Sequence, residues 1–331
     1  MKKLLAIILA AATVVGCANE ELVDVPREVI TFGDTFVDGA SRADYSNGEV
    51  VKAFKVYGVV NKGSGEAEQI FNAATVTSPN GLATDYSSAW LCDVTEYWAP
   101  NATYEFAAIV DGEVATQSEG LPATIPFTVA DGENNKDLLY AETSVTTNAS
   151  ATPTSGDLVA FSLEHLLAKM QFVVENGNAT VGDKDANGYE DGYAYKVTNI
   201  TVAGVAQDGV FTVENTEIEG HKYYGSWAKS GNATTSLTFG STEMVIGGSP
   251  NAKISSEGRQ FLPVEQELVV AATIDVYLNG ERVIEGLEKT ETIVARKYDS
   301  NRVYCVKLFI CSYNWGTTMS LDVGTNGGWS L

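Results

Sequence analysis

The stretch Glu28-Val-Ile-Thr-Phe-Gly-Asp-Thr-Phe-Val-Asp-Gly-Ala-Ser-Arg-Ala43 decides the fold. Side chains of an extended chain alternate between two faces, so Ile30, Phe32 and Phe36 fall on one apolar face. Arg42 follows among small residues, where a trypsin-like protease can enter. The stretch therefore predicts a strand that fills a place in a sheet of the precursor and is removed by a cut between Arg42 and Ala43. The ordinary alternative is a permanent first strand followed by a loop arginine.

Residues 1–16 are expected to form a secretory signal peptide that ends at a lipidation site. A basic start, Met1-Lys-Lys, precedes an apolar run over 4–15 that is too short to span a bilayer. The run ends in Val14-Val15-Gly16-Cys17, which resembles the lipobox of the lipoprotein signal peptidase, so Cys17 is expected to become the lipidated first residue. The acidic residues after Cys17 resemble a surface-export signal. We therefore expect a lipoprotein precursor attached to the outer membrane through its lipid anchor.

The composition limits the kinds of partner that the chain can have. It has 331 residues, 44% of them hydrophobic, which is enough for two packed domains. There are 43 acidic against 21 basic residues, giving a formal net charge of −22. An acidic surface without a basic stripe repels phosphate backbones, so no nucleic acid is expected as a partner.

Short alternating segments separated by turn dipeptides such as Asp-Gly and Asn-Gly predict an all-β fold built from sandwiches. Helical spacing occurs only over 163–170, where at most one turn is expected. The expected strands are 51–60, 104–110, 125–129, 138–142, 158–163, 169–175, 194–202, 209–213, 236–239, 243–246, 259–262, 267–278, 291–295 and 302–311.

A polar stretch over 146–156 has few apolar anchors and marks a domain boundary. The predicted organisation is a signal peptide (1–16), a lipidated propeptide with the removable strand (17–42), an N-terminal domain (43–157) and a C-terminal domain (158–331).

Three ordered stretches carry a resemblance to a known family. They are Tyr97-Trp-Ala-Pro-Asn-Ala-Thr-Tyr-Glu-Phe-Ala-Ala108, then Asp137-Leu-Leu-Tyr-Ala141 after Ile125-Pro-Phe-Thr-Val129, and finally Val159-Ala-Phe-Ser-Leu-Glu-His-Leu-Leu-Ala-Lys-Met-Gln-Phe172. Together they resemble the fimbrillin (Mfa-like) family, the subunits of type V pili. The resemblance implies two tandem β-sandwich domains of transthyretin-like topology. Ala99 departs from the family pattern, in which a proline often follows the tryptophan.

The resemblance also implies a route of assembly. In that family the lipidated precursor reaches the cell surface, an Arg-specific protease removes the N-terminal strand, and the C-terminal strand of a neighbouring copy fills the place. Arg42 matches the family's cleavage position, and Arg27 is the next candidate. The implied partners are other copies or related pilins, the surface protease and, for the precursor, the membrane. The expected destination is a fimbrium that supports adhesion.

A donor strand is expected near the end of the sequence. Apolar or β-branched residues occupy alternate positions of one face there, followed by a glycine-rich breaker. The alternative is that this segment pairs within its own domain as a last strand. The predicted donor residues are Trp315, Thr317, Met319, Leu321 and Val323.

One acidic loop has the spacing of a calcium site. Asp183, Asp185, Asn187 and Asp191 follow the first nine positions of a calcium-binding loop, with a glycine at the sixth. The twelfth position is Ala194 instead of the usual glutamate. The alternative is a polar hairpin between two strands. No other cofactor is expected.

The remaining residues give little support for catalysis. The only histidines, His165 and His221, have no metal-ligand spacing around them, and the sequence contains no HExxH, P-loop or dinucleotide motif. We therefore expect no enzyme, and packing roles for the thiols of Cys92, Cys305 and Cys311. Frequent tyrosine and tryptophan leave one alternative function open, a monomeric cell-surface lipoprotein that binds glycans.

Overall fold

The computed structural model describes residues 28–33, 36–37, 51–63, 65–78, 89–112, 114, 120–154, 158–176, 193–218, 221–240, 244–246, 253–278, 281–310 and 317–323. Across these ranges the regular structure is β-strand, apart from one 3-10 turn, η1 (Gly132–Asn134). None of the described residues belongs to a helix with the length and hydropathy needed to cross a membrane. The all-β prediction is therefore confirmed, whereas the tandem transthyretin-like sandwiches stay a prediction.

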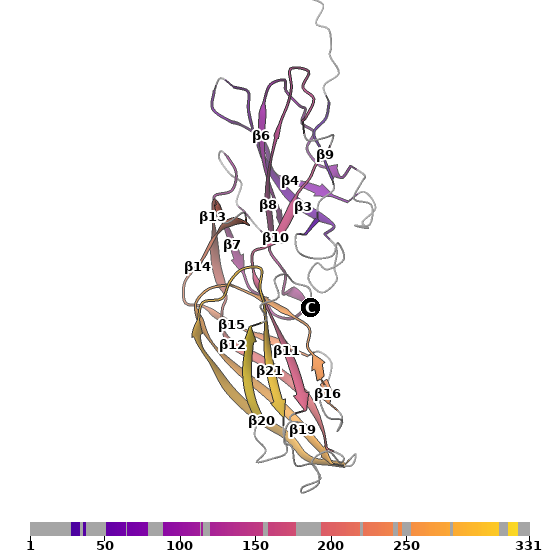
Figure 1. Ribbon diagram of the computed structural model, residues 1–331, viewed down its shortest axis with the longest axis vertical. Helices are drawn as coiled ribbons and strands as arrows, with labels where there is room; N and C mark the ends of the chain where they lie inside the picture. The colour runs from indigo at the N-terminus through magenta and orange to yellow at the C-terminus, as the bar shows by residue number, and fades with distance from the viewer. Residues whose placement is uncertain are drawn as a thin grey trace, which may run out of the picture.

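The molecule is elongated, with an upper and a lower half in the view of Figure 1. The main sheet of the upper half has the strand order β2-β10-β8-β6-β3-β4-β5 and is antiparallel except where β2 pairs with β10. A further parallel pair joins β1 to β9. The strands of the upper half are β1 (Thr31–Phe32), β2 (Phe36–Val37), β3 (Ala53–Asn61), β4 (Glu68–Thr77), β5 (Leu91–Cys92), β6 (Thr103–Val110), β8 (Leu139–Thr146), β9 (Leu158–Val159) and β10 (Ser162–His165).

Two five-stranded sheets form the lower half. One has the order β17-β11-β21-β22 with β18 also paired to β11, and the other has the order β15-β12-β19-β20 with β16 also paired to β12. All of these pairs are antiparallel except β11 with β21. The strands are β11 (Ala168–Asn176), β12 (Tyr193–Ala206), β15 (Thr234–Phe239), β16 (Met244–Ile246), β17 (Lys253–Ser255), β18 (Arg259–Phe261), β19 (Gln266–Leu278), β20 (Glu281–Arg296), β21 (Val303–Ile310) and β22 (Thr317–Val323).

A three-stranded sheet connects the two halves. It has the order β14-β13-β7 and combines β7 (Thr124–Thr128) with the hairpin of β13 (Asp208–Ile218) and β14 (His221–Lys229). Tyr140 of β8 packs edge-on against Tyr224 of β14, with ring centroids 5.3 Å apart. The hairpin therefore covers one face of the upper sheet, and strands from both halves share the lower hydrophobic core.

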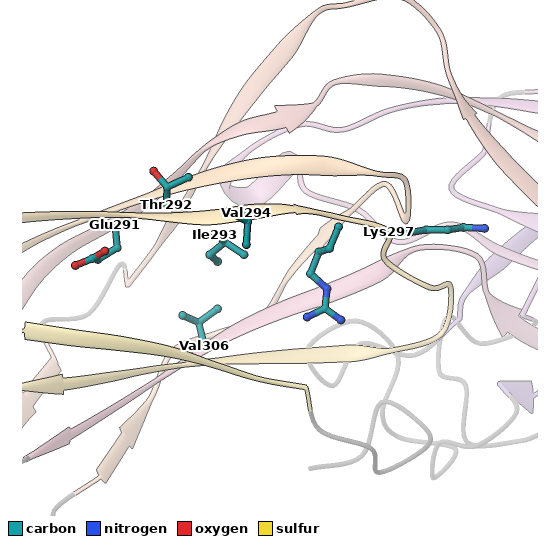
Figure 2. A pocket seen from close by; sticks show the side chains of 7 residues that line it. Glu291, Thr292, Ile293, Val294, Lys297 and Val306 are labelled. Carbon is teal, nitrogen blue, oxygen red and sulfur yellow. The ribbon is translucent and has the colours of Figure 1, made fainter.

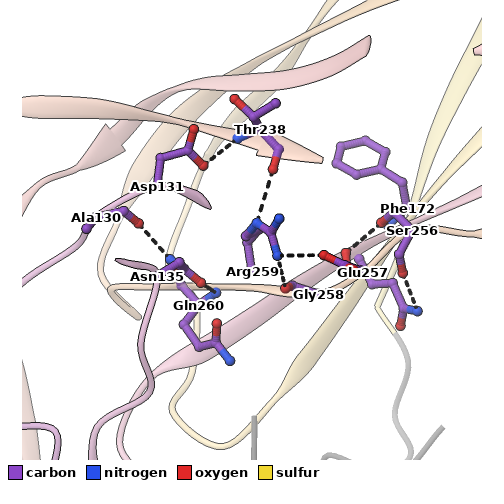
Figure 3. A network of polar contacts seen from close by, with 11 residues as sticks. Ala130, Asp131, Asn135, Phe172, Thr238, Ser256, Glu257, Gly258, Arg259 and Gln260 are labelled. Atoms are coloured by element: carbon purple, nitrogen blue, oxygen red, sulfur yellow. Dashed lines mark hydrogen bonds and ion pairs between the residues drawn. The ribbon is translucent and has the colours of Figure 1, made fainter. Parts of the chain in front are cut away.

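Polar contacts fix the joint between the halves (Figure 3). The Asn135 side chain donates to the carbonyls of Ala130 (2.8 Å) and Gln260 (2.9 Å) and accepts from the Gln260 amide (2.7 Å). The Thr238 amide donates to the Asp131 carboxylate at 2.8 Å. Since Asn135 and Gln260, and likewise Asp131 and Thr238, are more than 100 residues apart, their contacts tie the turn after β7 to β15 and β18.

Arg259 lies beside this joint and connects β18 to β15 within the lower half. Its side chain is buried and donates through Nε to the Thr238 carbonyl (3.1 Å), and through Nη1 to the Gly258 carbonyl (3.3 Å) and the Glu257 carboxylate (3.2 Å). The buried guanidinium is stabilising only while all of these acceptors are present, because an uncompensated buried charge is costly.

Most expected strands are present with shifted ends, but β4, β5, β14 and β17 were not predicted. The helical turn over 163–170 is wrong, because β10 and β11 occupy most of that stretch. Val159, Phe161 and Leu163 pack in the upper core, although the predicted boundary assigns them to the C-terminal domain. The 157/158 boundary stays a prediction.

Candidate functional site

The N-terminal segment (residues 28–33 and 36–37) is the candidate functional element. Ile30 and Phe32 are 2% and 0% exposed, Thr31 is half-buried, and Val29 points outward. The predicted alternation is thus confirmed over these residues, because i and i+2 side chains share a face. For Phe36 the structure describes the backbone only, as part of β2.

Main-chain hydrogen bonds hold the segment on one side to residues 90–98. The Trp98 amide donates to the Glu28 carbonyl (3.0 Å), the Ile30 amide to the Glu96 carbonyl (2.8 Å), and the Trp90 amide to the Phe32 carbonyl (2.8 Å). These contacts are antiparallel, as in the bridges of Val29 with Tyr97 and of Phe32 with Trp90.

The other side of the segment pairs with β9 and β10 in parallel. Phe32 lies opposite Val159, the Gly33 amide donates to the Val159 carbonyl (3.1 Å), and Phe36 lies opposite Ser162. The N-terminal segment is therefore an inserted strand, with later parts of the chain hydrogen-bonded along both of its edges.

The Phe32 side chain occupies the centre of the upper core. Its ring centroid lies 5.4 Å from Phe71, 5.9 Å from Phe106, and 6.2 Å from Phe54 and from Phe161. Three of these contacts are edge-to-face and one is stacked, the geometries that aromatic pairs prefer. Residues from β3, β4, β6 and the β9–β10 link therefore form a cage around one side chain of the N-terminal segment.

The cage depends on a glycine in β3. A Cβ added at Gly58 would lie 2.9 Å from Cδ1 of Phe106 and 3.0 Å from Cδ2 of Phe71. Glycine at this position lets both rings approach the backbone of β3 and turn their edges toward Phe32.

A buried contact between a histidine and a carboxylate lies at the end of the strand that supports β2. His165 of β10 contacts the Asp137 carboxylate through Nδ1, and both side chains are fully buried. His165 sits opposite Leu139 of β8, two residues beyond Leu163, the register partner of Val37. A carboxylate beside the ring fixes the orientation of the imidazole and anchors β10 to the loop before β8. Packing was expected for His165, but its acidic partner was not.

The predicted donor segment forms β22, antiparallel to β21 at the edge of its sheet. Leu321 lies opposite Val306, Met319 opposite Leu308 and Val323 opposite Tyr304, while Thr317 lies opposite Ile310. In the single chain this segment is thus the last strand of its own sheet. Its donation to a neighbouring copy stays a prediction.

The other predicted site residues lie outside the described residues: Cys17, Arg42, Ala43, Trp315 and the calcium candidates Asp183, Asp185, Asn187 and Asp191. Within the described ranges no cluster of acidic, histidine and cysteine side chains suits a metal ion. The calcium site and the cleavage site stay predictions.

Two of the cysteines are described, and neither forms a disulfide. Cys92 lies in β5 beside Trp90, and Cys305 lies in β21. Burial raises the pKa of the Cys92 thiol, an effect that the neighbouring Asp93 carboxylate reinforces. Cys92 therefore keeps its proton above the usual pH range of a thiol, next to a residue that bonds the N-terminal segment.

Comparisons with known proteins agree with this architecture. The most similar solved structures include a protein assigned to cell adhesion from Bacteroides uniformis (13% identity, TM-score 0.54, 90% of this chain and 97% of that chain covered). A fimbrial protein from Bacteroides vulgatus matches with 14% identity and a TM-score of 0.54, over 84% of this chain and 93% of that chain. At these identities the likeness concerns the fold. No curated protein matches.

A family comparison is more specific than the structural ones. The model of the fimbrillin-like family matches residues 41–267, which is more than half of the sequence. The match covers β3 to β18, including the four rings that surround Phe32 and the hairpin that joins the halves, whereas the N-terminal segment and β20 to β22 lie outside it. The chain therefore belongs to the fimbrillin-like family.

Proposed function

We propose that the chain is the precursor of a pilus subunit that polymerises by strand exchange at the cell surface. In this proposal Cys17 carries the lipid that brings the precursor to the outer membrane, and an Arg-specific protease cuts between Arg42 and Ala43. The N-terminal segment then leaves, and residues 315–323 of a neighbouring copy take its place. Family membership and similarity to a fimbrial protein support this function.

The observation that carries the proposal is the place of the N-terminal segment in the fold. It precedes the proposed cut, yet it supplies Phe32 to the centre of the upper core and hydrogen-bonds along both edges. A cut after Arg42 would leave the segment held only by noncovalent contacts. Its departure would expose unpaired main-chain groups and an apolar row, which together form a template for another strand.

The free energy of these contacts favours displacement of the N-terminal segment by another strand over its spontaneous dissociation. Burying the side chains of Ile30 and Phe32 contributes about 1.5–3 kcal/mol each, before the main-chain hydrogen bonds are counted. A cut segment would therefore remain seated until a competing strand arrives. Met319, Leu321 and Val323 follow the same two-residue period, so they are suited to fill the same row of sites.

The cleavage step is tested by replacing Arg42 with alanine. The Arg42→Ala precursor, treated with an Arg-specific protease, should give no ladder on a gel run in mild detergent, whereas the wild-type chain should give ladders that survive mild detergent. The matched control is Arg27→Ala, which leaves the proposed cut intact and should polymerise like the wild type. Polymerisation of the Arg42→Ala chain that is lost in Arg27→Ala would move the cut to Arg27. Polymerisation of both variants would show that the mechanism requires proteolysis at neither site.

The glycan-binding alternative stays a prediction. Trp90 and Trp98 are buried, and Trp98 packs edge-on against Tyr104 at 4.7 Å, as the packing interpretation of the aromatic residues expects.

A further inference from the structure

The exposed large apolar side chains among the described residues gather at two edges of the molecule. Leu91, Val94 and Tyr97 lie at β5 and in the loop after it, and we call them the upper patch. Val283 and Val294 lie on β20, and Val294 is the most exposed of all at 75%. β20 is the last strand of its sheet, so Val294 lies beside an open edge. The upper patch lies beside the N-terminal segment, whose exposed Val29 is bridged to Tyr97.

The upper patch is apolar with acidic surroundings. Asp93 is exposed and Glu96 half-buried, and the described residues 89–98 and 28–33 contain no lysine or arginine. Tyr97 is 47% exposed, although its neighbour Trp98 is buried. Residues 91–97 come after the proposed cut, so the upper patch persists in the mature chain.

A pocket of about 490 Å³ lies at the end of β20 (Figure 2). Successive residues of β20 line it together with Val306 of β21. Since neighbouring side chains of a strand point to opposite faces, a pocket lined by consecutive residues must run along the edge of the strand. The lining residues are Glu291, Thr292, Ile293, Val294, Arg296, Lys297 and Val306.

This pocket is basic within an acidic protein. Arg296 and Lys297 outnumber the single carboxylate, that of Glu291. The Arg296 guanidinium lies over the rings of Tyr298 (5.6 Å) and Tyr304 (5.8 Å), and its Nε atom is buried without a hydrogen-bond partner. Burial raises the pKa of Tyr298 to about 12, so this phenol stays neutral and gives Arg296 no counter-charge. The pocket therefore presents an apolar wall and a guanidinium whose buried Nε atom has no acceptor.

We propose that the upper patch of one copy docks into the β20 pocket of a second copy. Leu91, Val94 and Tyr97 would cover Val294 and Ile293, while the acidic residues beside them meet Arg296 and Lys297. Both surfaces are exposed in the same chain, so the contact forms between copies. The choice of a second copy as partner rests on the proposed function, because a contact between two unlike surfaces of one chain propagates into an open array.

The test uses Arg42→Ala precursor throughout, so that strand exchange plays no part in the result. Sedimentation velocity over a concentration series at low salt should show reversible self-association that weakens as salt is added, because exposed charges are screened beyond about 10 Å at 0.1 M. A pocket variant, Arg296→Glu with Lys297→Glu, should lose association by on the order of tenfold. A patch variant, Thr95→Lys with Glu96→Lys, should lose it similarly. Asp93 is kept, because its carboxylate accepts the Thr75 amide.

Mixing the pocket variant with the patch variant is the decisive experiment. Each variant alone brings like charges together, whereas in the mixture each patch meets a pocket of opposite sign, so association should return. Lys52→Glu with Lys229→Glu makes the same charge change as the pocket variant at two exposed positions elsewhere and should associate like the parent. The proposal would be overturned if the Arg42→Ala parent stays monomeric or if the mixed variants do not associate. It would also be overturned if the control variant loses as much association as the pocket variant. None of these results depends on whether strand exchange occurs.

Discussion

At the scale of single residues, Phe32 connects the precursor's stability to the proposed assembly. It is fully buried in contact with four other phenylalanine rings, yet it lies before the proposed cut. The same side chain would therefore stabilise the precursor and be missing from the mature subunit. Two predictions about the upper core follow from this position, one for Phe32 and one for Cys92.

Phe32→Ala should destabilise the precursor by about 3–5 kcal/mol, because it removes a large buried ring from a closed cage. Denaturant unfolding of the precursor measures this loss. Val29→Ala is the matched control, since Val29 lies in the same segment but is exposed, and it should change the unfolding free energy by less than about 0.5 kcal/mol. If Phe32→Ala is as mild as its control, the segment does not complete the upper core in solution.

Cys92 should report the departure of the segment. Its pKa is raised chiefly by burial, so at pH 8 little thiolate is present and alkylation is slow. Loss of the neighbouring segment would open the site, lower the pKa toward its usual value and speed alkylation. The measurement compares Cys92 with Cys305 by peptide mass spectrometry, before and after the protease cut, in a chain that lacks residues 315–331. Because this chain has no donor strand, the cut segment should stay bound, and Cys92 should react equally slowly before and after the cut. A faster Cys92 rate after the cut would show that the segment leaves without a competing strand. Cys305, in the lower half, should not respond in either case.

At the scale of elements, alternation predicts most strands, and the misses have physical reasons. β4 carries a bulge opposite Gly58, and Ala73 there has a positive φ of 58°, so its apolar residues lose the two-residue period. The pairing of β13 with β14 likewise shifts between Val213 and Thr216. The sequence pattern alone does not identify a strand when a bulge in its pairing interrupts the two-residue period of its apolar side chains.

The false helical signal over 163–170 has a different origin. Leu163 belongs to the upper core, whereas Leu166, Leu167 and Met170 belong to the lower core. The chain crosses from one core to the other, so both of its faces are buried, and the apolar residues acquire helical spacing without forming a helix.

The candidate site was partly predictable. Ile30 and Phe32 follow from alternation, but the partners of the N-terminal segment, residues 90–98 and β9, are set by pairing between distant parts of the chain. The same holds for His165 and Asp137, which are 28 residues apart and meet only because β8 and β10 pair.

The tail gives the element-scale prediction. Deleting residues 315–331 removes β22, an edge strand with one paired neighbour, so the chain should keep its fold by circular dichroism. After the cut it should accept a donor strand but offer none. Added to wild-type chains, it should therefore stop growth and shorten the ladders in proportion to its share. A deleted chain that polymerises by itself would rule out donation by this segment, and one that misfolds would favour its role as a last strand of its own sheet.

At the scale of the whole molecule, the halves are joined by the β14-β13-β7 sheet and by the contacts of Asn135 and Asp131. The halves are thus held together by strand pairing as well as by packing. In the proposed pilus such a joint would transmit load between an accepting upper half and a donating lower half. The docking of the upper patch into the β20 pocket would add a contact between the bodies of neighbouring copies.

The central claim is that another copy replaces the N-terminal segment. Denaturing mass spectrometry of polymers taken from the cell surface tests it most directly. The account predicts subunits that begin at Ala43, with no peptide 17–42 retained. Subunits that still begin at an acylated Cys17, or a stoichiometric amount of the 17–42 peptide in the polymer, would contradict it.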